Sequence, residues 1–117
     1  MTHQSPEIPP LLGPDEQPPY SVYNPDGQSG VVLVCDHARN AIPRSLAGLG
    51  LPPEVLATHI GLDIGCEHLS KKIADRLDST LVIAGFSRLV VDPNRPPDHP
   101  TSIPAQSDGI DIPGNRS

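Results

Sequence analysis

The chain has 117 residues and a formal net charge of −6, from 8 basic and 14 acidic side chains. Because nucleic-acid binding needs a basic face, this charge argues against nucleic acid as the main partner. The sequence has no apolar stretch of the ~18 residues that a membrane-spanning helix needs, and its acidic, proline-rich start is unlike a signal peptide.

Proline is concentrated towards both ends of the chain. Seven of the 16 prolines precede Gly27, and six more lie within residues 93–113. Proline fixes φ and removes a backbone donor, so these ends are poor material for helices or central strands. The sequence therefore predicts a proline-rich leader over residues 1–29, in which any strand at residues 20–23 would be short. The self-contained apolar segment covers residues 31–92.

The first predicted element of the apolar segment is a strand at residues 31–35. Its continuous apolar run is typical of a strand buried on both faces. Asp36, His37 and Asn40 follow it directly, at the place where open α/β sheets bind ligands. An imidazole with these neighbours could hold a metal or position a substrate. The alternative is that His37 merely caps a loop.

Helical segments follow this strand. We expect a brief turn at residues 45–49, stopping at Gly50, and a short helix at residues 53–59 that begins with proline and an acid. Residues 65–77 have the best helical pattern, since their apolar side chains recur at helical spacing on one face. These side chains are Cys66, Leu69, Ile73, Ala74 and Leu77. Two cysteines are too few for a disulfide scaffold, so we expect buried thiols in a reducing cytoplasm.

Two further strands are expected, at residues 80–84 and 89–91. The order of strand, helix and strand predicts a right-handed crossover and a parallel pair, hence an α/β fold with one clear βαβ unit. The four residues between the last two strands are too few for a helical crossover. The third strand should therefore pair antiparallel or extend the second with a bend.

A second polar group of side chains follows residues 89–91. Arg95 could grip a carboxylate through two charge-assisted hydrogen bonds, and Asn94 could add a donor. The alternative is that Arg95 pairs with Asp92 or Asp98 inside a loop. Taken alone, the two interpretations are comparable.

Three motifs occur in order along the chain and identify a family. They read CDHARNAIP at residues 35–43, HIGLDIG at residues 59–65 and FSRLVVDPNR at residues 86–95. With the proline-rich tail through IPGN at residues 112–115, they resemble the N-formylglutamate amidohydrolase family over residues 30–115. Residues 30–117 would then be the N-terminal part of such a domain.

The resemblance implies a fold and a metal site. This family resembles the zinc carboxypeptidases and aspartoacylases, which have an α/β fold with a central mixed sheet. Their zinc-ligand histidine ends a strand, and an acidic ligand follows three residues later. His37 matches the histidine, but Asn40 stands where the carboxylate is expected, and an amide binds zinc poorly. Asp63 or Asp36 would supply the missing oxygen.

The resemblance also implies a reaction. In the same relatives an Asn-Arg pair binds the substrate carboxylate, and Asn94 and Arg95 match it, with Arg88 a weaker candidate for the same anion. The implied activity is metal-assisted hydrolysis of the amide or formyl bond of an N-acylated acidic amino acid such as N-formylglutamate. A divalent ion, zinc by resemblance, would lower the pKa of a water molecule and polarise the carbonyl.

The competing hypothesis is a truncated half-domain without activity, or one that only binds a partner. The resemblance implies a further ligand histidine and a general acid or base downstream of residue 115, so no catalytic residue is assigned. An uncovered sheet edge and helix face would favour self-association. We therefore expect the 117-residue chain to bind zinc weakly and to hydrolyse N-formylglutamate negligibly, and a version of full family length to be active.

Overall fold

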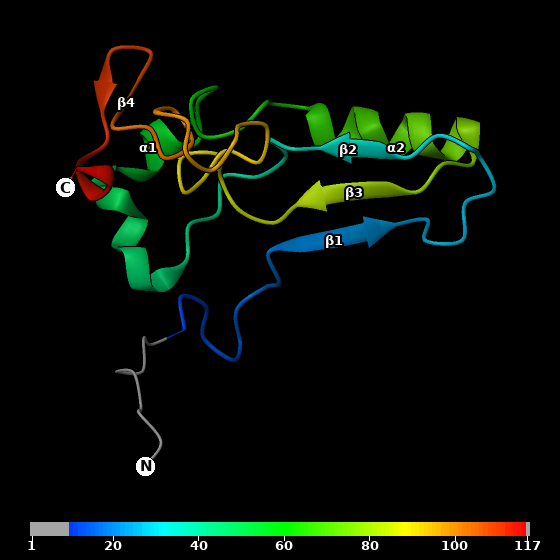
Figure 1. The fold of residues 1–117 in the computed structure, drawn as a ribbon, viewed down its shortest axis with the longest axis horizontal. Coiled ribbons are helices and arrows are strands. Elements are labelled where there is room, and N and C mark those ends of the chain that lie inside the picture. Colours follow the sequence, from blue (N-terminus) through cyan, green and yellow to red (C-terminus); the bar gives the residue numbers. More distant parts are fainter. Residues whose placement is uncertain (1–9, 117) are drawn as a thin grey trace.

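A computed structural model describes residues 10–116 (Figure 1). These residues form two regions, one built on a sheet and one built mostly of loops, which are called the sheet unit and the loop unit below. The sheet unit consists of β1 (Tyr20–Tyr23), β2 (Leu33–Cys35), β3 (Leu81–Ala84) and helix α2 (Cys66–Leu77). The strand order is β1-β3-β2, with β2 parallel and β1 antiparallel to β3. The fold is therefore of the mixed α/β class.

The predicted βαβ unit is confirmed. Leu33 pairs with Leu81 and Cys35 with Ile83 in a parallel register, and α2 packs against both strands. The helix begins after Gly65, which adopts φ 80°, and ends at Asp78, which adopts φ 51°. The positive φ at Asp78 reverses the chain, so that β3 can return along the sheet.

The core of the sheet unit lies between α2 and one face of the sheet. Its buried members are Cys35, Ala38, Ala74, Leu81 and Ile83, called the sheet core below. Leu81 and Ile83 point inwards because alternate residues of a strand face opposite sides of its sheet. This period of two explains why Val82, between them, is only half-buried.

The expectation that residues 31–35 are buried on both faces is wrong. Val34 is 64% exposed and Val22, in β1, is 44% exposed, because within residues 10–116 α2 covers one face of the sheet and no helix covers the other. The predicted apolar face of α2 is likewise only partly used. Ala74 is fully buried, whereas Leu69 is 59% and Leu77 52% exposed.

The loop unit is built from short elements. They are η1 (Arg44–Gly50), α1 (Pro53–Leu56), β4 (Gln106–Ser107), β5 (Ile110–Asp111) and η2 (Pro113–Asn115), with residues 85–105 as connecting loop. Four buried side chains form its core, called the loop core: Leu49, Ile60, Leu89 and Ile112. The chain does turn at residues 45–49, but Ala47, Gly48 and Leu49 adopt φ of 50°, 65° and 56°, so the expected helical turn is interrupted by a kink. The helix expected at residues 53–59 is shorter than predicted.

The third predicted strand, at residues 89–91, is wrong. The Val90 N–H donates to the Ser87 carbonyl at 3.0 Å, so the segment is a turn. Leu89 is buried in the loop core, its N–H donates to Ser87 Oγ, and its carbonyl accepts from the Asn115 side chain. An apolar run predicted a strand here, but the Leu89 backbone groups form hydrogen bonds with side chains and not with a neighbouring strand.

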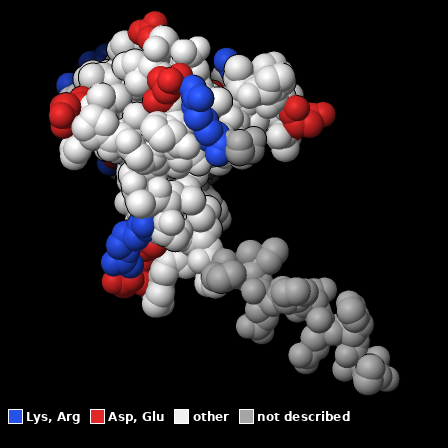
Figure 2. All heavy atoms as spheres, turned by 90° about the vertical axis from the view of Figure 1, so that its left-hand side faces the viewer, with Lys and Arg blue, Asp and Glu red and all other residues white. Residues whose placement is uncertain are grey.

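Residues 10–29 include β1, which lies within the segment expected to be an irregular leader. The boundary between the leader and the domain remains a prediction. Residues 1–9 of the predicted leader lie outside the described range. Among residues 10–116, no helix is long and apolar enough to cross a membrane. Figure 2 shows one face of the molecule, on which basic and acidic side chains are mixed rather than gathered by sign.

Candidate active site

His37 stands where β2 leaves the sheet, and both of its ring nitrogens have partners. Nε2 lies 2.7 Å from Asp92 Oδ1. The His37 carbonyl accepts a backbone hydrogen bond of 2.7 Å from the Asp63 N–H, which fixes the two segments to each other. The position after the carboxyl end of the strand, predicted from sequence, thus receives groups from two distant loops.

Asp92 is the residue that holds His37. It is 8% exposed, and its Oδ1 also accepts the Asn94 N–H at 2.9 Å. Burial by itself raises the pKa of Asp92, but the hydrogen bonds from His37 and Asn94 outweigh it and lower this pKa below its usual value. Asp92 is therefore ionised at neutral pH and fixes the imidazole orientation.

Asp63 and Arg88 face the other nitrogen of His37. His37 Nδ1 lies 3.4 Å from Asp63 Oδ2 and 3.3 Å from Arg88 Nη1, while Arg88 Nη1 lies 3.5 Å from Asp63 Oδ1. A guanidinium can only donate, so in the neutral imidazole Nδ1 accepts and Nε2–H donates to Asp92. Nδ1 therefore turns a lone pair towards the side of Asp63 and Arg88.

The Arg88 guanidinium is held from several sides. Besides the contact with His37, its Nε donates to the Ile60 carbonyl at 3.2 Å and its other terminal nitrogen donates to the His59 carbonyl. These bonds join the HIGLDIG segment to the segment after β3. Arg88 thus fixes the spacing of the cluster and places a positive charge beside Asp63.

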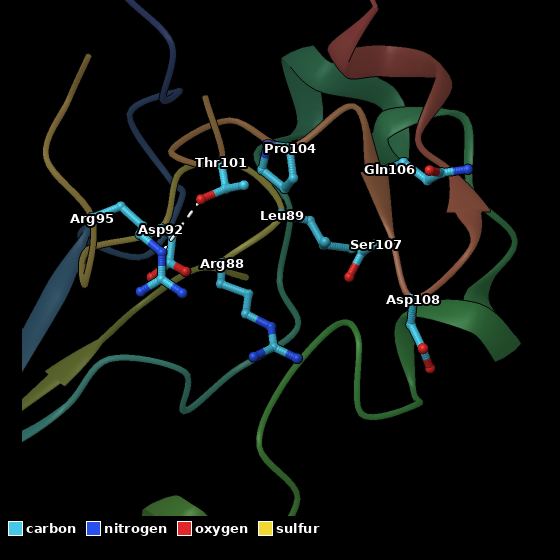
Figure 3. Close-up of a pocket in the computed structure, with 9 residues that line it drawn as sticks. All are labelled: Arg88, Leu89, Asp92, Arg95, Thr101, Pro104, Gln106, Ser107 and Asp108. Atoms are coloured by element: carbon cyan, nitrogen blue, oxygen red, sulfur yellow. Dashed lines mark hydrogen bonds between the residues drawn. The ribbon is translucent and has the colours of Figure 1, made fainter. Parts of the chain in front are cut away.

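A pocket of about 300 Å³ adjoins this cluster (Figure 3). Arg88, Asp92 and Arg95 line one side of it, and the β4–β5 hairpin supplies Gln106, Ser107 and Asp108 on another. Arg95 Nη1 donates to the Asn94 carbonyl at 2.9 Å and Nε to Thr101 Oγ1 at 3.3 Å. Its second terminal nitrogen has no hydrogen-bond partner within residues 10–116.

The other predicted residues lie apart from this cluster. Asn40 Nδ2 donates to the Leu56 carbonyl at 3.1 Å, so its amide anchors α1. Asp36 lines a separate pocket with Tyr20 and Val34. Asn94 contributes its backbone N–H to Asp92, and its side chain does not line the 300 Å³ pocket.

Sequence reasoning considered Asp92 only as a partner for Arg95 and missed its bond to His37. The signal that could have found it is a carboxylate immediately after an apolar run, directly before Pro93. Position alone does not say which histidine such a carboxylate contacts, since the two residues are 55 apart in sequence.

The side chains around His37 include the nitrogen and oxygen donors that a divalent metal binds, but there are fewer of them than a catalytic metal site uses. His37 Nδ1 and the half-exposed Asp63 carboxylate are neighbouring nitrogen and oxygen donors, and Asp92 bonds the second ring nitrogen, as carboxylates do for ligand histidines. Catalytic zinc sites use three protein ligands. Residues 10–116 contain no group of three or more His, Cys, Asp or Glu side chains arranged to hold a metal.

Comparison with known proteins finds a matching family and a similar solved structure. The family model for N-formylglutamate amidohydrolase matches residues 29–117. A solved structure, "The crystal structure of gene product Atu2144 from Agrobacterium tumefaciens", is 38% identical with a TM-score of 0.86, over 90% of this chain and 42% of that one. This chain therefore spans less than half the length of that protein. No curated protein matches the chain.

Proposed function

The chain belongs to the N-formylglutamate amidohydrolase family, and we propose that its His37 cluster and the adjoining pocket serve metal-assisted hydrolysis of an N-acylated acidic amino acid such as N-formylglutamate. The observation that carries this proposal is the fixed imidazole. Buried Asp92 holds His37 Nε2 at 2.7 Å, and Nδ1 faces Asp63 beside a pocket lined by Arg95. The zinc-carboxypeptidase-like architecture implied by the motifs is part of the same proposal.

The metal would bind at His37 Nδ1 and the Asp63 carboxylate. When bound, such an ion supplies a water of lowered pKa and a polarised carbonyl. Asp92 would position His37 through the 2.7 Å bond to Nε2, as carboxylates do for ligand histidines. Arg88 would give up its 3.3 Å contact with Nδ1 when a cation occupies this place, and its backbone bonds would keep it nearby.

Arg95 is the proposed anchor for a substrate carboxylate. It lines the pocket, and the hydrogen bonds to Asn94 and Thr101 leave donors free for a two-pronged contact. Asn94 supports this role by holding the turn through Asp92 and the Arg95 side chain through its carbonyl. Arg88 lines the same pocket and would contribute positive charge there.

Binding measurements on the 117-residue chain test the two halves of the proposal separately. In zinc titration calorimetry, His37→Ala should abolish detectable binding and Asp92→Asn should weaken it by about tenfold. His99→Ala is the matched control, because among the described residues the His99 ring forms hydrogen bonds only with Thr101. Equal zinc affinity in His37→Ala and His99→Ala would refute the metal assignment.

The substrate assignment is tested with N-formylglutamate as the titrant. Arg95→Ala should lose binding, whereas Arg116→Ala, which removes an exposed arginine paired with Asp111 at 2.8 Å, should not. Loss in both variants would mean that general charge attracts the ligand, and the proposed anchor would be wrong.

A deformylation assay with and without zinc tests the reaction. Two donors are fewer than a catalytic site uses, so we expect weak zinc binding and negligible turnover by these 117 residues, and activity in a version of full family length. Zinc-dependent turnover by the 117 residues that disappears in His37→Ala would show that the site is more complete than proposed. An inactive longer version would favour the alternative of a non-catalytic, partner-binding protein.

A further inference from the structure

Two thiols meet beside the candidate active site and take no part in the proposed reaction. Cys35 Sγ lies 3.2 Å from Cys66 Sγ, although the two residues are 31 apart in sequence. Cys35 is the last residue of β2 and Cys66 the first of α2, and both are free thiols. The packing of α2 on the sheet is therefore what brings them together.

We propose that Cys35 and Cys66 form a reversible oxidation site, at which a hydroperoxide converts the two thiols into one intrachain disulfide. A disulfide has an S–S distance of about 2.05 Å, so the sulfur atoms need to approach by only ~1 Å. Both atoms end short side chains, and rotation about the side-chain bonds supplies most of this approach.

The two cysteines differ in exposure, which assigns their roles. Cys66 is half-buried and can meet the oxidant, whereas Cys35 is 1% exposed and cannot. Cys66 also lies in the first turn of α2. The neighbouring negative charge of Glu67 is offset by Arg39 at 2.8 Å and Lys71 at 3.0 Å.

The reaction proceeds in two balanced steps. The Cys66 thiolate attacks the peroxide, takes up one oxygen as a sulfenic acid, and the alkoxide or hydroxide that leaves is protonated by water. Cys35 sulfur then attacks the Cys66 sulfur, the S–S bond forms, and the leaving hydroxide takes the Cys35 proton to become water. In sum, two thiols are oxidised while one hydroperoxide is reduced to an alcohol and water.

The disulfide would lie close to the candidate active site in the chain. Cys35 precedes His37 by two residues, and Cys66 follows Asp63 by three. A covalent bond would join the segments that carry these two side chains and limit changes in their 3.4 Å separation. The oxidation itself does not depend on the proposed hydrolysis, so either can fail without the other.

The experiment counts thiols in the wild-type protein. The reduced 117-residue chain is treated with hydrogen peroxide, unfolded, alkylated with iodoacetamide and digested with trypsin. We expect both thiols to disappear together, a peptide of residues 1–39 to be linked to one of residues 45–71, and dithiothreitol to restore both. In Cys35→Ser, Cys66 should instead advance to sulfinic acid, and in Cys66→Ser, Cys35 should remain alkylatable.

Three outcomes overturn the proposal. One is a wild-type protein in which Cys66 becomes sulfinic acid while Cys35 stays a thiol. Another is disulfide formation only between separate chains, visible as a dimer without reductant. The third is a pair of thiols that both survive an excess of peroxide. None of these measurements depends on whether a variant folds.

Discussion

The sheet unit and the loop unit are stabilised in different ways. In the sheet unit, backbone groups of β1, β2 and β3 pair with one another, and apolar side chains fill the space below α2. In the loop unit, polar side chains bind the backbone. Ser87 Oγ donates to the Gly61 carbonyl at 2.6 Å, and Asn115 Nδ2 donates to the Leu89 and Pro104 carbonyls at 2.7 and 2.8 Å.

This difference predicts what each unit tolerates. A sheet accepts changes that preserve apolar volume, because its hydrogen bonds do not depend on side-chain identity. An irregular segment depends on individual polar side chains and on close backbone approaches, since buried N–H and C=O groups must be paired by some group. The candidate active site lies where the units meet, with His37 after β2 and Asp92 in the loop unit.

The largest expected effect is a cavity in the sheet core. Leu81 is fully buried beneath α2, so Leu81→Ala should lower the free energy of unfolding by about 3 kcal/mol. Urea unfolding followed by circular dichroism measures it. Leu69→Ala is the control, because Leu69 is 59% exposed on α2 and its removal should cost less than about 0.5 kcal/mol. Similar costs for both would mean that α2 does not pack on the sheet as described.

In the loop unit, the corresponding change adds volume instead of removing it. A methyl group on Gly61 would lie 2.9 Å from the Leu56 carbonyl carbon and still closer to its oxygen. Gly61→Ala should therefore destabilise by roughly 2 to 3 kcal/mol, measured by urea unfolding. Gly30→Ala serves as its partner, since nothing lies within 4 Å of the position its methyl would occupy. If the two alanine variants unfold at the same urea concentration, the close approach at Gly61 is not real.

Removing a polar anchor should have a somewhat smaller effect. Asn115→Ala leaves the Leu89 and Pro104 carbonyls without their side-chain donor, which should cost about 2 kcal/mol. Gln106→Ala is the comparison, because that amide makes one exposed, 3.4 Å contact with Asp111. A wild-type-like Asn115→Ala would show that water replaces the amide and that the loop unit is not built on such bonds.

The fold of the sheet unit could be predicted from the sequence, whereas that of the loop unit could not. The βαβ unit was predictable because helical spacing in residues 65–77 and apolar runs on both sides leave one sensible arrangement. The turn at Leu89 was not, because an apolar run in a loop core looks like a strand until its hydrogen-bond partners are known. Those partners come from Ser87 and, more remotely, Asn115.

In the candidate site, too, the residues could be predicted from the sequence, but some of their contacts could not. His37, Asp63, Arg88 and Arg95 were predicted from motifs, and the structure brings the first three into contact, with Arg95 lining the adjoining pocket beside Arg88. The role of Asp92 was missed, and Asn40 was considered as a ligand although it caps a carbonyl of α1. Residue type and position restrict chemistry, but the partner of a buried polar group depends on the path of distant loops.

The smallest expected effect concerns an ion pair that ties the loop after β2 to α2. Arg39 Nε lies 2.8 Å from Glu67 Oε1, and Lys71 Nζ lies 3.0 Å from Oε2. The hydrogen bond from Arg39 is the main cause that lowers the pKa of Glu67 below its usual 4.5, with a smaller contribution from Lys71. Both groups are partly exposed, so Glu67→Gln should cost less than about 1 kcal/mol at neutral pH.

The dependence of this cost on pH separates charge from packing. A carboxyl group whose pKa is lower in the folded state stabilises the protein above its unfolded pKa, and this stabilisation is lost as pH falls through the folded pKa. The wild type should thus lose its advantage over Glu67→Gln as pH drops below about 4, while both keep the same difference between about pH 6 and 8. Urea unfolding of the two proteins across this range measures it. A difference that persists unchanged in acid would mean that Glu67 acts through its shape, and that the sheet unit, like the loop unit, depends on side-chain identity at this point.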